Sequence, residues 1–195
     1  MSTNAGKALV CIDFINEIVH PSGKLAVKGY AMFLDRHNTL ARVAEVQKRF
    51  RNKGIPIVHV KVGFSPSYYE HPSDSPLFGK ARELKTLTLG TWGTEFASQV
   101  APSSDEIVIV KHRVNAFHGT ALDLILRTRG IRELYIAGVA TDLAVESAAR
   151  DAHDHDYKIT ILSDCCVAAS DDDHARGLTF LKKIAHITTL DALGL

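Results

Sequence analysis

Short runs of apolar, mostly β-branched residues recur along the chain, and they constrain its fold more than any other feature. They are residues 8–12, 56–60, 106–110, 133–137 and 158–162, with a weaker sixth candidate at 185–188. Most of these runs lack the alternation of apolar and polar residues that marks a strand with one wet face. Continuous apolar runs of this length are typical of strands buried on both faces, as in a parallel sheet.

The segments between these runs have the periodicity of amphipathic helices. Residues 30–52, 121–129, 142–156 and 173–183 each place apolar side chains on one stripe. Strands that alternate with helices in this way are typical of a doubly wound α/β fold. We therefore predict a three-layer αβα sandwich with a mainly parallel sheet of about six strands. The 195 residues suit a single domain that covers residues 1–195.

One long segment, residues 62–102, shows no strong pattern and is rich in residues that break regular structure. It contains Pro66, Pro72, Pro76, Gly79, Gly90 and Gly93. Irregular stretches of this length in a compact domain usually form lids, binding loops or interfaces. We predict that this segment forms a pocket wall and a contact between subunits, with a short helix around residues 93–100.

The composition argues against several kinds of partner. Hydrophobic residues make up 46% of the chain and charged residues 23%, and the formal net charge is +1. A net charge this small favours neither nucleic acid nor an anionic membrane surface. No apolar run reaches the ~20 residues that span a bilayer, and residues 1–7 lack the layout of a secretion signal. We expect a cytoplasmic protein with no nucleic-acid or membrane partner.

The cysteines point to the same compartment. The chain has three, Cys11, Cys165 and Cys166, and two of them are adjacent. An odd count with this spacing is a poor disulfide framework and favours a reducing environment. The spacing also lacks the paired CxxC signature of a zinc site.

Chemically useful residues follow several of the predicted strands. In an open parallel sheet, ligands bind outside the carboxyl ends of the strands. Asp13 follows the first run, Lys111 follows the third, and the small residues of 138–144 connect the fourth run to a helix. A carboxylate at such an edge suits acid or base catalysis, a lysine stabilises negative charge, and a helix N-terminus binds an oxyanion. Taken singly, each also fits a structural role: a turn-forming Asp, a lysine reaching solvent, and an ordinary strand-to-helix turn.

Taken together, these positions resemble one known family. The matching segments are residues 8–14, 108–112 with 116–120, 136–142 continued by 145–152, and 164–166 with 168–169. Their order and contents are similar to the isochorismatase-like superfamily, also called cysteine hydrolases. The resemblance covers nearly the whole chain, and it is the combination of segments that makes it specific.

The resemblance implies a site and an assembly. The family's catalytic Asp, Lys and Cys match Asp13, Lys111 and Ala144. In family members the Asp deprotonates the Cys, which attacks an amide carbonyl, and two backbone N–H groups, matching Ala140 and Ala144, hold the oxyanion. A cis peptide bond is typical at the position that matches Val139–Ala140, so the loop from Val139 to Thr141 is part of the implied site. Family members usually form dimers or tetramers, which implies a homodimer or homotetramer here.

The chain departs from the family pattern at three places. Position 144 is alanine, so the thiol that would attack the substrate is absent. Ile15 stands where the family usually has a glutamine. The family's nicotinamidases bind a metal through a cluster of acidic and histidine residues after the second strand, and the segment from His59 onward lacks this cluster. His71 and Asp74 lie further on, but they lack convincing partner ligands. We therefore expect no metal and no cofactor, and nicotinamide is a poor candidate substrate.

Other groups near the site are weaker candidates. The cysteines are expected to be buried structural residues, and Thr141 has no recognisable base beside it in the sequence. His153 and His155 are two residues apart, so they do not share a helix face. Aromatic and histidine residues are candidate substrate contacts in the pocket wall. They are Phe14, Phe64, Trp92, Phe117 and His118, with His112 flanking the Lys111 loop.

Three functions remain open for a small-molecule site of this kind. The first is a cysteine amidohydrolase of C–N bonds in which Ala144 replaces the nucleophile, whether by nature or by engineering. The second is a hydrolase that works without a cysteine and uses Asp13 as the acid in vinyl-ether hydrolysis, as isochorismatases do. The third is a catalytically silent protein that binds a small molecule on the same fold. We favour the first lineage on the sequence around position 144, while Ala144 itself excludes thiol catalysis in this chain.

Overall fold

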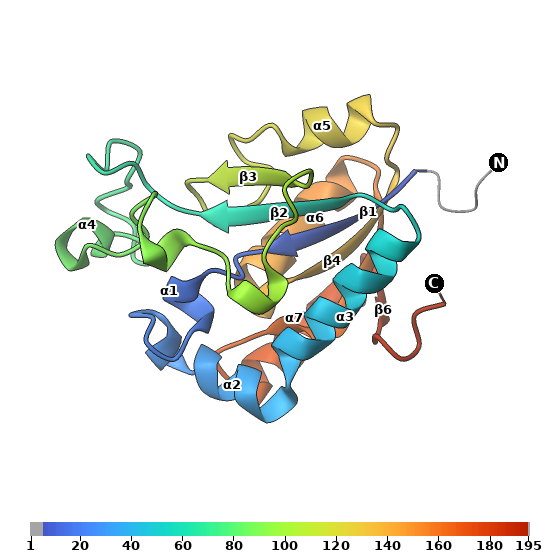
Figure 1. The fold of residues 1–195 in the computed structure, drawn as a ribbon, viewed down its shortest axis with the longest axis horizontal. Helices are drawn as coiled ribbons and strands as arrows, with labels where there is room; N and C mark the ends of the chain where they lie inside the picture. The colour runs from blue at the N-terminus through green and yellow to red at the C-terminus, as the bar shows by residue number, and fades with distance from the viewer. Residues whose placement is uncertain (1–5, 195) are drawn as a thin grey trace.

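The protein, represented by a computed structural model that describes residues 6–194, is built on one six-stranded sheet (Figure 1). The first five residues, part of the segment in which no secretion signal is expected, lie outside the described range. The strands are β1 (Lys7–Ile12), β2 (Ile57–Val62), β3 (Ile107–Lys111), β4 (Glu133–Val139), β5 (Lys158–Val167) and β6 (His186–Thr188). Their order is β3-β2-β1-β4-β5-β6, and every neighbouring pair is parallel. This confirms the predicted doubly wound sheet.

Two layers of helices cover the sheet. The helices are α1 (Asn16–Val19), α2 (Tyr30–His37), α3 (Thr39–Asn52), α4 (Ala81–Leu84), α5 (Leu122–Thr128), α6 (Glu146–Asp154) and α7 (Asp171–Leu181). Side chains of α2 and α3 pack on one face, while those of α5, α6 and α7 pack on the other. Successive residues of β1 alternate between the two cores, with Leu9 and Cys11 in one and Val10 and Ile12 in the other. A strand buried on both faces must be apolar throughout, which explains the continuous runs.

Within the described residues, no helix is long and apolar enough to cross a lipid bilayer.

Three predicted helices differ from the observed ones. The helix expected over residues 30–52 is two helices, because Asn38 adopts a left-handed conformation with φ of 50° and ends α2. The helix expected from residue 142 begins as a π-helical turn, Thr141–Val145, before α6. The helix expected around 93–100 is instead two separate 3₁₀ turns, Trp92–Thr94 and Ser98–Val100. In the first two cases the local backbone changes conformation inside a segment whose apolar pattern is uninterrupted, whereas residues 93–100 belong to the irregular stretch 62–102.

The topology gathers the strand ends that carry the predicted site. Because β1 lies between β2 and β4, and β2 lies beside β3, the carboxyl ends of these strands meet at one edge of the sheet. Figure 1 shows the arrowheads of β2 and β3 pointing toward the segment that carries α4, at that same edge.

Candidate active site

A buried ion pair forms the floor of the site. The Lys111 ammonium lies 2.7 Å from Oδ2 of Asp13, and the two side chains are only 1% and 4% exposed. The backbone N–H of Val62 donates to the other oxygen, Oδ1, at 2.7 Å. Lys111 is the last residue of β3 and Asp13 follows β1, so β2 lies between them and supplies the third group from its own end.

The other two N–H donors of the Lys111 ammonium also have acceptors. Lys111 Nζ donates to the carbonyl oxygens of Arg113 at 3.1 Å and Val114 at 2.9 Å. An ammonium group has three donors, and with Asp13 each of them has an acceptor. Lys111 is therefore held in one place, and it points into the protein instead of reaching for solvent.

Burial raises the pKa of the Asp13 carboxyl above its ordinary value of 3.8. The neighbouring Lys111 and the hydrogen bond from Val62 act in the opposite direction but do not outweigh the loss of solvent. A carboxylate with a raised pKa is a stronger base when ionised and a useful proton donor when protonated. Asp13 is thus suited to move a proton in both directions during one reaction.

The loop after β4 forms the other side of the floor. The Val139–Ala140 peptide bond is cis, at the position that the resemblance indicated. Gly138 precedes it, and a Cβ atom there would lie 2.8 Å from Ile12 Cβ and 3.1 Å from Val145 Cγ2. Only glycine lets β4 approach β1 this closely.

These groups open into one cavity of about 580 Å³. Asp13, Lys111, Val139, Ala140 and Ala144 all line it. Its wall comes mainly from two segments, residues 18–30 and 73–87. The second lies within the irregular stretch 62–102, which confirms that this stretch forms a pocket wall; its role in a subunit contact stays a prediction.

The wall is tied together by Glu17, a buried residue that sequence reasoning did not identify. Its Oε1 accepts the backbone N–H of Lys24 at 3.1 Å, and its Oε2 accepts that of Leu87 at 3.2 Å. One carboxylate therefore joins the two wall segments, although Leu87 lies 70 residues further along the chain. A glutamate four residues after Asp13 gave no sequence signal for this role, because its partners are backbone groups.

Thr141 lies beside a histidine that is far from it in the sequence. Its Oγ1 lies 2.8 Å from Nδ1 of His174 in α7 and 3.1 Å from the carbonyl oxygen of Val167. A carbonyl can only accept, so both contacts are satisfied if the hydroxyl donates to Val167 and Nδ1–H of His174 donates to the hydroxyl. Thr141 is fully buried and is not among the residues that line the cavity. Its contacts anchor the loop to β5 and α7.

The cysteines are buried away from the cavity, as expected. Cys11 and Cys165 belong to one core and Cys166 to the other, and none of them lines the cavity. Burial raises the pKa of the thiols of Cys11 and Cys166 to about 12, and it raises that of Cys165 still further. None of the three can supply a thiolate near neutral pH.

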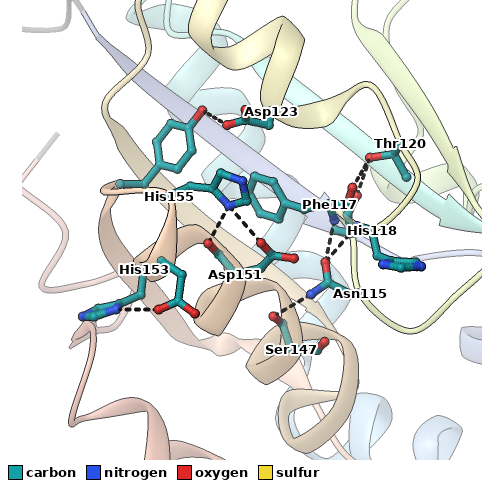
Figure 2. Close-up of polar contacts among 12 residues, drawn as sticks. Asn115, Phe117, His118, Thr120, Asp123, Ser147, Asp151, His153 and His155 are labelled. Carbon is teal, nitrogen blue, oxygen red and sulfur yellow. Dashed lines mark hydrogen bonds and ion pairs between the residues drawn. The ribbon is translucent and has the colours of Figure 1, made fainter.

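The predicted substrate contacts lie elsewhere in the structure. Phe14 and Phe64 are buried in the core, and Trp92 is half-exposed with its ring edge against His20. Phe117 is buried and stacks on His155, as Figure 2 shows, while His118 lines a separate surface groove. None of these five is among the residues that line the cavity.

Two neighbouring histidines have structural contacts of their own. Nδ1 of His155 lies 2.8 Å from Oδ1 of Asp151, and Nδ1 of His153 lies 3.4 Å from Oδ1 of Asp154. His112, which flanks Lys111, places Nδ1 2.7 Å from the carbonyl oxygen of Gly63. Across residues 6–194, no group of three or more His, Cys, Asp or Glu side chains is arranged to hold a metal ion.

Comparison with known proteins agrees with this geometry. The isochorismatase domain matches residues 7–192. The chain is 34% identical over 177 residues to the ureidoacrylate amidohydrolase RutB of Acinetobacter baylyi, covering 83% of this chain and 71% of that protein.

Two solved structures have the same fold. An isochorismatase family protein from Desulfovibrio vulgaris superposes with a TM-score of 0.86 at 25% identity, covering 97% of this chain and 96% of that one. The N-carbamoylsarcosine amidase of Thermoplasma acidophilum superposes with a TM-score of 0.76 at 29% identity, covering 97% of this chain and 99% of that one. The protein described here therefore belongs to the isochorismatase family of hydrolases.

Proposed function

We propose that this protein hydrolyses a C–N bond in a small-molecule amide, with water taking the part of the missing thiol. The observation that carries the proposal is the buried Asp13–Lys111 pair, which lines the same cavity as Ala144. The similarity to an amidohydrolase and an amidase supports C–N chemistry. The alanine methyl cannot attack a carbonyl, so the nucleophile must come from outside the protein or from the cavity wall.

Asp13 is the group that activates this water. As a carboxylate it takes one proton from the water, and the oxygen adds to the amide carbonyl. The N–H groups of Ala140 and Ala144 stabilise the oxyanion that forms. The intermediate then collapses, the C–N bond breaks, and Asp13 returns its proton to the leaving nitrogen. The products are a carboxylic acid and an amine or ammonia.

Lys111 has a positioning role in this scheme. Its ammonium keeps the carboxylate in one orientation and offsets the charge of this nearly buried group. Because all three of its donors are occupied, it is not a second proton donor. The mechanism therefore assigns the acid and base steps to Asp13 alone.

The experiment is an assay for ammonia release from ureidoacrylate and from a panel of primary amides and N-carbamoyl compounds. We expect turnover by the unaltered chain and a loss of about 10²- to 10⁴-fold in kcat for Asp13→Asn. Ala144→Cys tests the thiol, and Ala192→Cys, which adds a thiol on the exposed C-terminal segment, is its control. Turnover that appears only in Ala144→Cys would contradict the water mechanism and identify this chain as an inactivated cysteine amidohydrolase.

A second function is favoured by the raised pKa of Asp13. A carboxyl that keeps its proton to higher pH is suited to protonate a vinyl ether, as the isochorismatase reaction requires. Turnover of isochorismate in place of amides would support this reaction. Tight binding of a ligand without turnover of either class would instead indicate a protein that only binds its small molecule.

A further inference from the structure

The cavity is much larger than its reactive floor, and we infer that it accepts an elongated amphipathic amide that carries a carboxylate at its far end. The inference rests on the proposed function in one respect, the placement of the reacting carbonyl at Asp13. The apolar body of the substrate lies along the wall, and its carboxylate lies at the rim between Lys28 and Lys80.

Size is the first argument. The cavity of about 580 Å³ falls within the range of sites that enclose drug-sized ligands. An amide of a few atoms would occupy the floor and leave most of the wall in contact with water. The wall is therefore part of the binding site for a longer molecule.

The chemistry of the wall is the second argument. Above the floor, most of the side chains that line the cavity are apolar. They include Ile18, Leu25, Phe78, Leu84, Leu87 and Leu143. Three of them, Leu77, Leu84 and Leu143, are 44%, 51% and 38% exposed, so this apolar surface faces solvent around the cavity. Covering such a surface with an apolar ligand is favourable in proportion to the area removed from water.

The rim supplies the third argument, which is charge. Asp13 and Lys111 neutralise each other at the floor, whereas three lysines and one aspartate, Asp74, line the rest of the cavity. Lys24 already donates to the carbonyl oxygens of Leu84 at 2.8 Å and Lys85 at 3.2 Å. Lys28 and Lys80 make backbone hydrogen bonds, but among the described residues neither of their side-chain ammonium groups has a hydrogen-bond or ion-pair partner. These two ammonium groups are available to an anionic ligand.

The backbone that carries these lysines is held tightly. Beside Lys28, a Cβ atom on Gly29 would lie 2.1 Å from the carbonyl oxygen of Ala169. Beside Lys80, a Cβ atom on Gly79 would lie 2.6 Å from the carbonyl oxygen of Ser75. Both positions are so close-packed that only glycine fits, which fixes where the two lysine side chains begin.

The test uses three six-carbon primary amides that differ only at the far end. They are hexanamide, the monoamide of adipic acid and 6-aminohexanamide, which end in a methyl group, a carboxylate and an ammonium. Binding is measured by calorimetry at low and high salt. We expect the carboxylate to bind about five- to tenfold more tightly than the methyl compound, with the ammonium weakest, because each exposed ion pair contributes modestly.

Lysine variants test whether Lys28 and Lys80 cause the preference for the carboxylate. Lys28→Gln with Lys80→Gln is expected to abolish the preference for the carboxylate, while Lys48→Gln, an exposed lysine on α3, leaves it unchanged. The four-carbon monoamide of succinic acid is two methylene groups shorter, and it is expected to gain less from its carboxylate if the lysines lie at the far end of the cavity. Equal binding of all three six-carbon amides, or a preference that survives in the double variant, would overturn the inference.

The test of the substrate class can be distinguished from the test of amide hydrolysis. Binding preference is measured without turnover, so a carboxylate preference with no ammonia release would support this substrate class and count against amide hydrolysis. Conversely, release of ammonia from all three amides at equal affinity would support the hydrolase and reject the lysine rim.

Discussion

The floor and the wall of the cavity are built in different ways. At the floor, Asp13 follows β1 and Lys111 ends β3, with β2 between the two strands. Both side chains are almost completely buried and have partners for their charged atoms. The wall comes from connecting segments, and several of its side chains, such as Leu77 and Leu84, face solvent. The buried Asp13–Lys111 pair is thus positioned by the sheet, whereas the wall residues are carried by short helices and loops that rely on a few long-range contacts.

The contrast has a physical basis. A parallel sheet fixes the separation and direction of its strand ends, so a residue at such an end is placed by many backbone hydrogen bonds at once. A loop has no such ladder, and it is placed by individual groups such as Glu17, which joins the backbones of Lys24 and Leu87. Changes at the floor are therefore expected to affect the whole molecule, and changes in the wall to act locally.

The largest effect is expected from Lys111→Met, which leaves the Asp13 carboxylate buried without its ammonium. Removing one partner of a buried ion pair typically costs about 3 to 5 kcal/mol. The measurement is the free energy of unfolding in urea at pH 7. The double variant Asp13→Leu/Lys111→Met is expected to recover part of the loss, since no charge is then stranded. A loss below about 1 kcal/mol for Lys111→Met would show that the floor is not built around this pair.

The pH dependence of Asp13 provides the next test. Its raised pKa means that the folded protein binds this proton more tightly than the unfolded chain does. Its contribution to stability is therefore greatest at low pH and falls as the pH rises from 3.8 through the raised pKa. We expect Asp13→Asn, which removes this titration, to become more stable relative to the unaltered protein as the pH rises from 4 to 8. Urea titrations at each pH measure this difference, and the opposite slope would mean that Lys111 lowers the pKa below its ordinary range.

In the wall, Glu17→Ala is expected to act locally. It leaves the N–H groups of Lys24 and Leu87 without their acceptor, at a cost of about 1 to 3 kcal/mol if they stay buried. Hydrogen exchange is expected to speed up near residues 84–94 while the strands keep their protection, and KM is expected to rise more than kcat falls. Glu17→Gln retains one acceptor oxygen and serves as the matched control. Faster hydrogen exchange throughout the sheet would contradict the prediction that a change in the wall acts only locally.

The smallest effect is expected from Thr141→Val, which keeps the shape of the side chain but removes its hydroxyl. Val167 and His174 each lose a partner, at a cost of about 1 kcal/mol. Thr179→Val, at an exposed position in α7 whose hydroxyl contacts only the carbonyl of Ala175, is the comparison. Thermal unfolding measures both. A larger loss at Thr179 would mean that the contact between Thr141 and His174 does not anchor the loop.

The sequence predicted the part of the site that depends on strand ends. The apolar runs identified all six strands, and in a parallel sheet the residues at their carboxyl ends share an edge, so Asp13, Lys111 and the turn 138–144 could be named without coordinates. The family resemblance then singled out Ala144 within that turn. The positions of the aromatic residues chosen as substrate contacts do not follow from the order of the strands, and none of these residues lines the cavity. Phe14 and Phe64 turned inward to the core because burying a large apolar ring is favourable wherever a core is in reach.

The sequence by itself determined the order of strands and helices, the family, and which residues lie at the carboxyl edge, because apolar periodicity and strand ends are local properties of a chain. Only the tertiary structure decided which residues line the cavity, the contacts of Glu17 with Lys24 and Leu87, and the pairing of Thr141 with His174. These features depend on contacts between residues far apart in the sequence. The geometry of such contacts is set by how the layers pack, which no local pattern records.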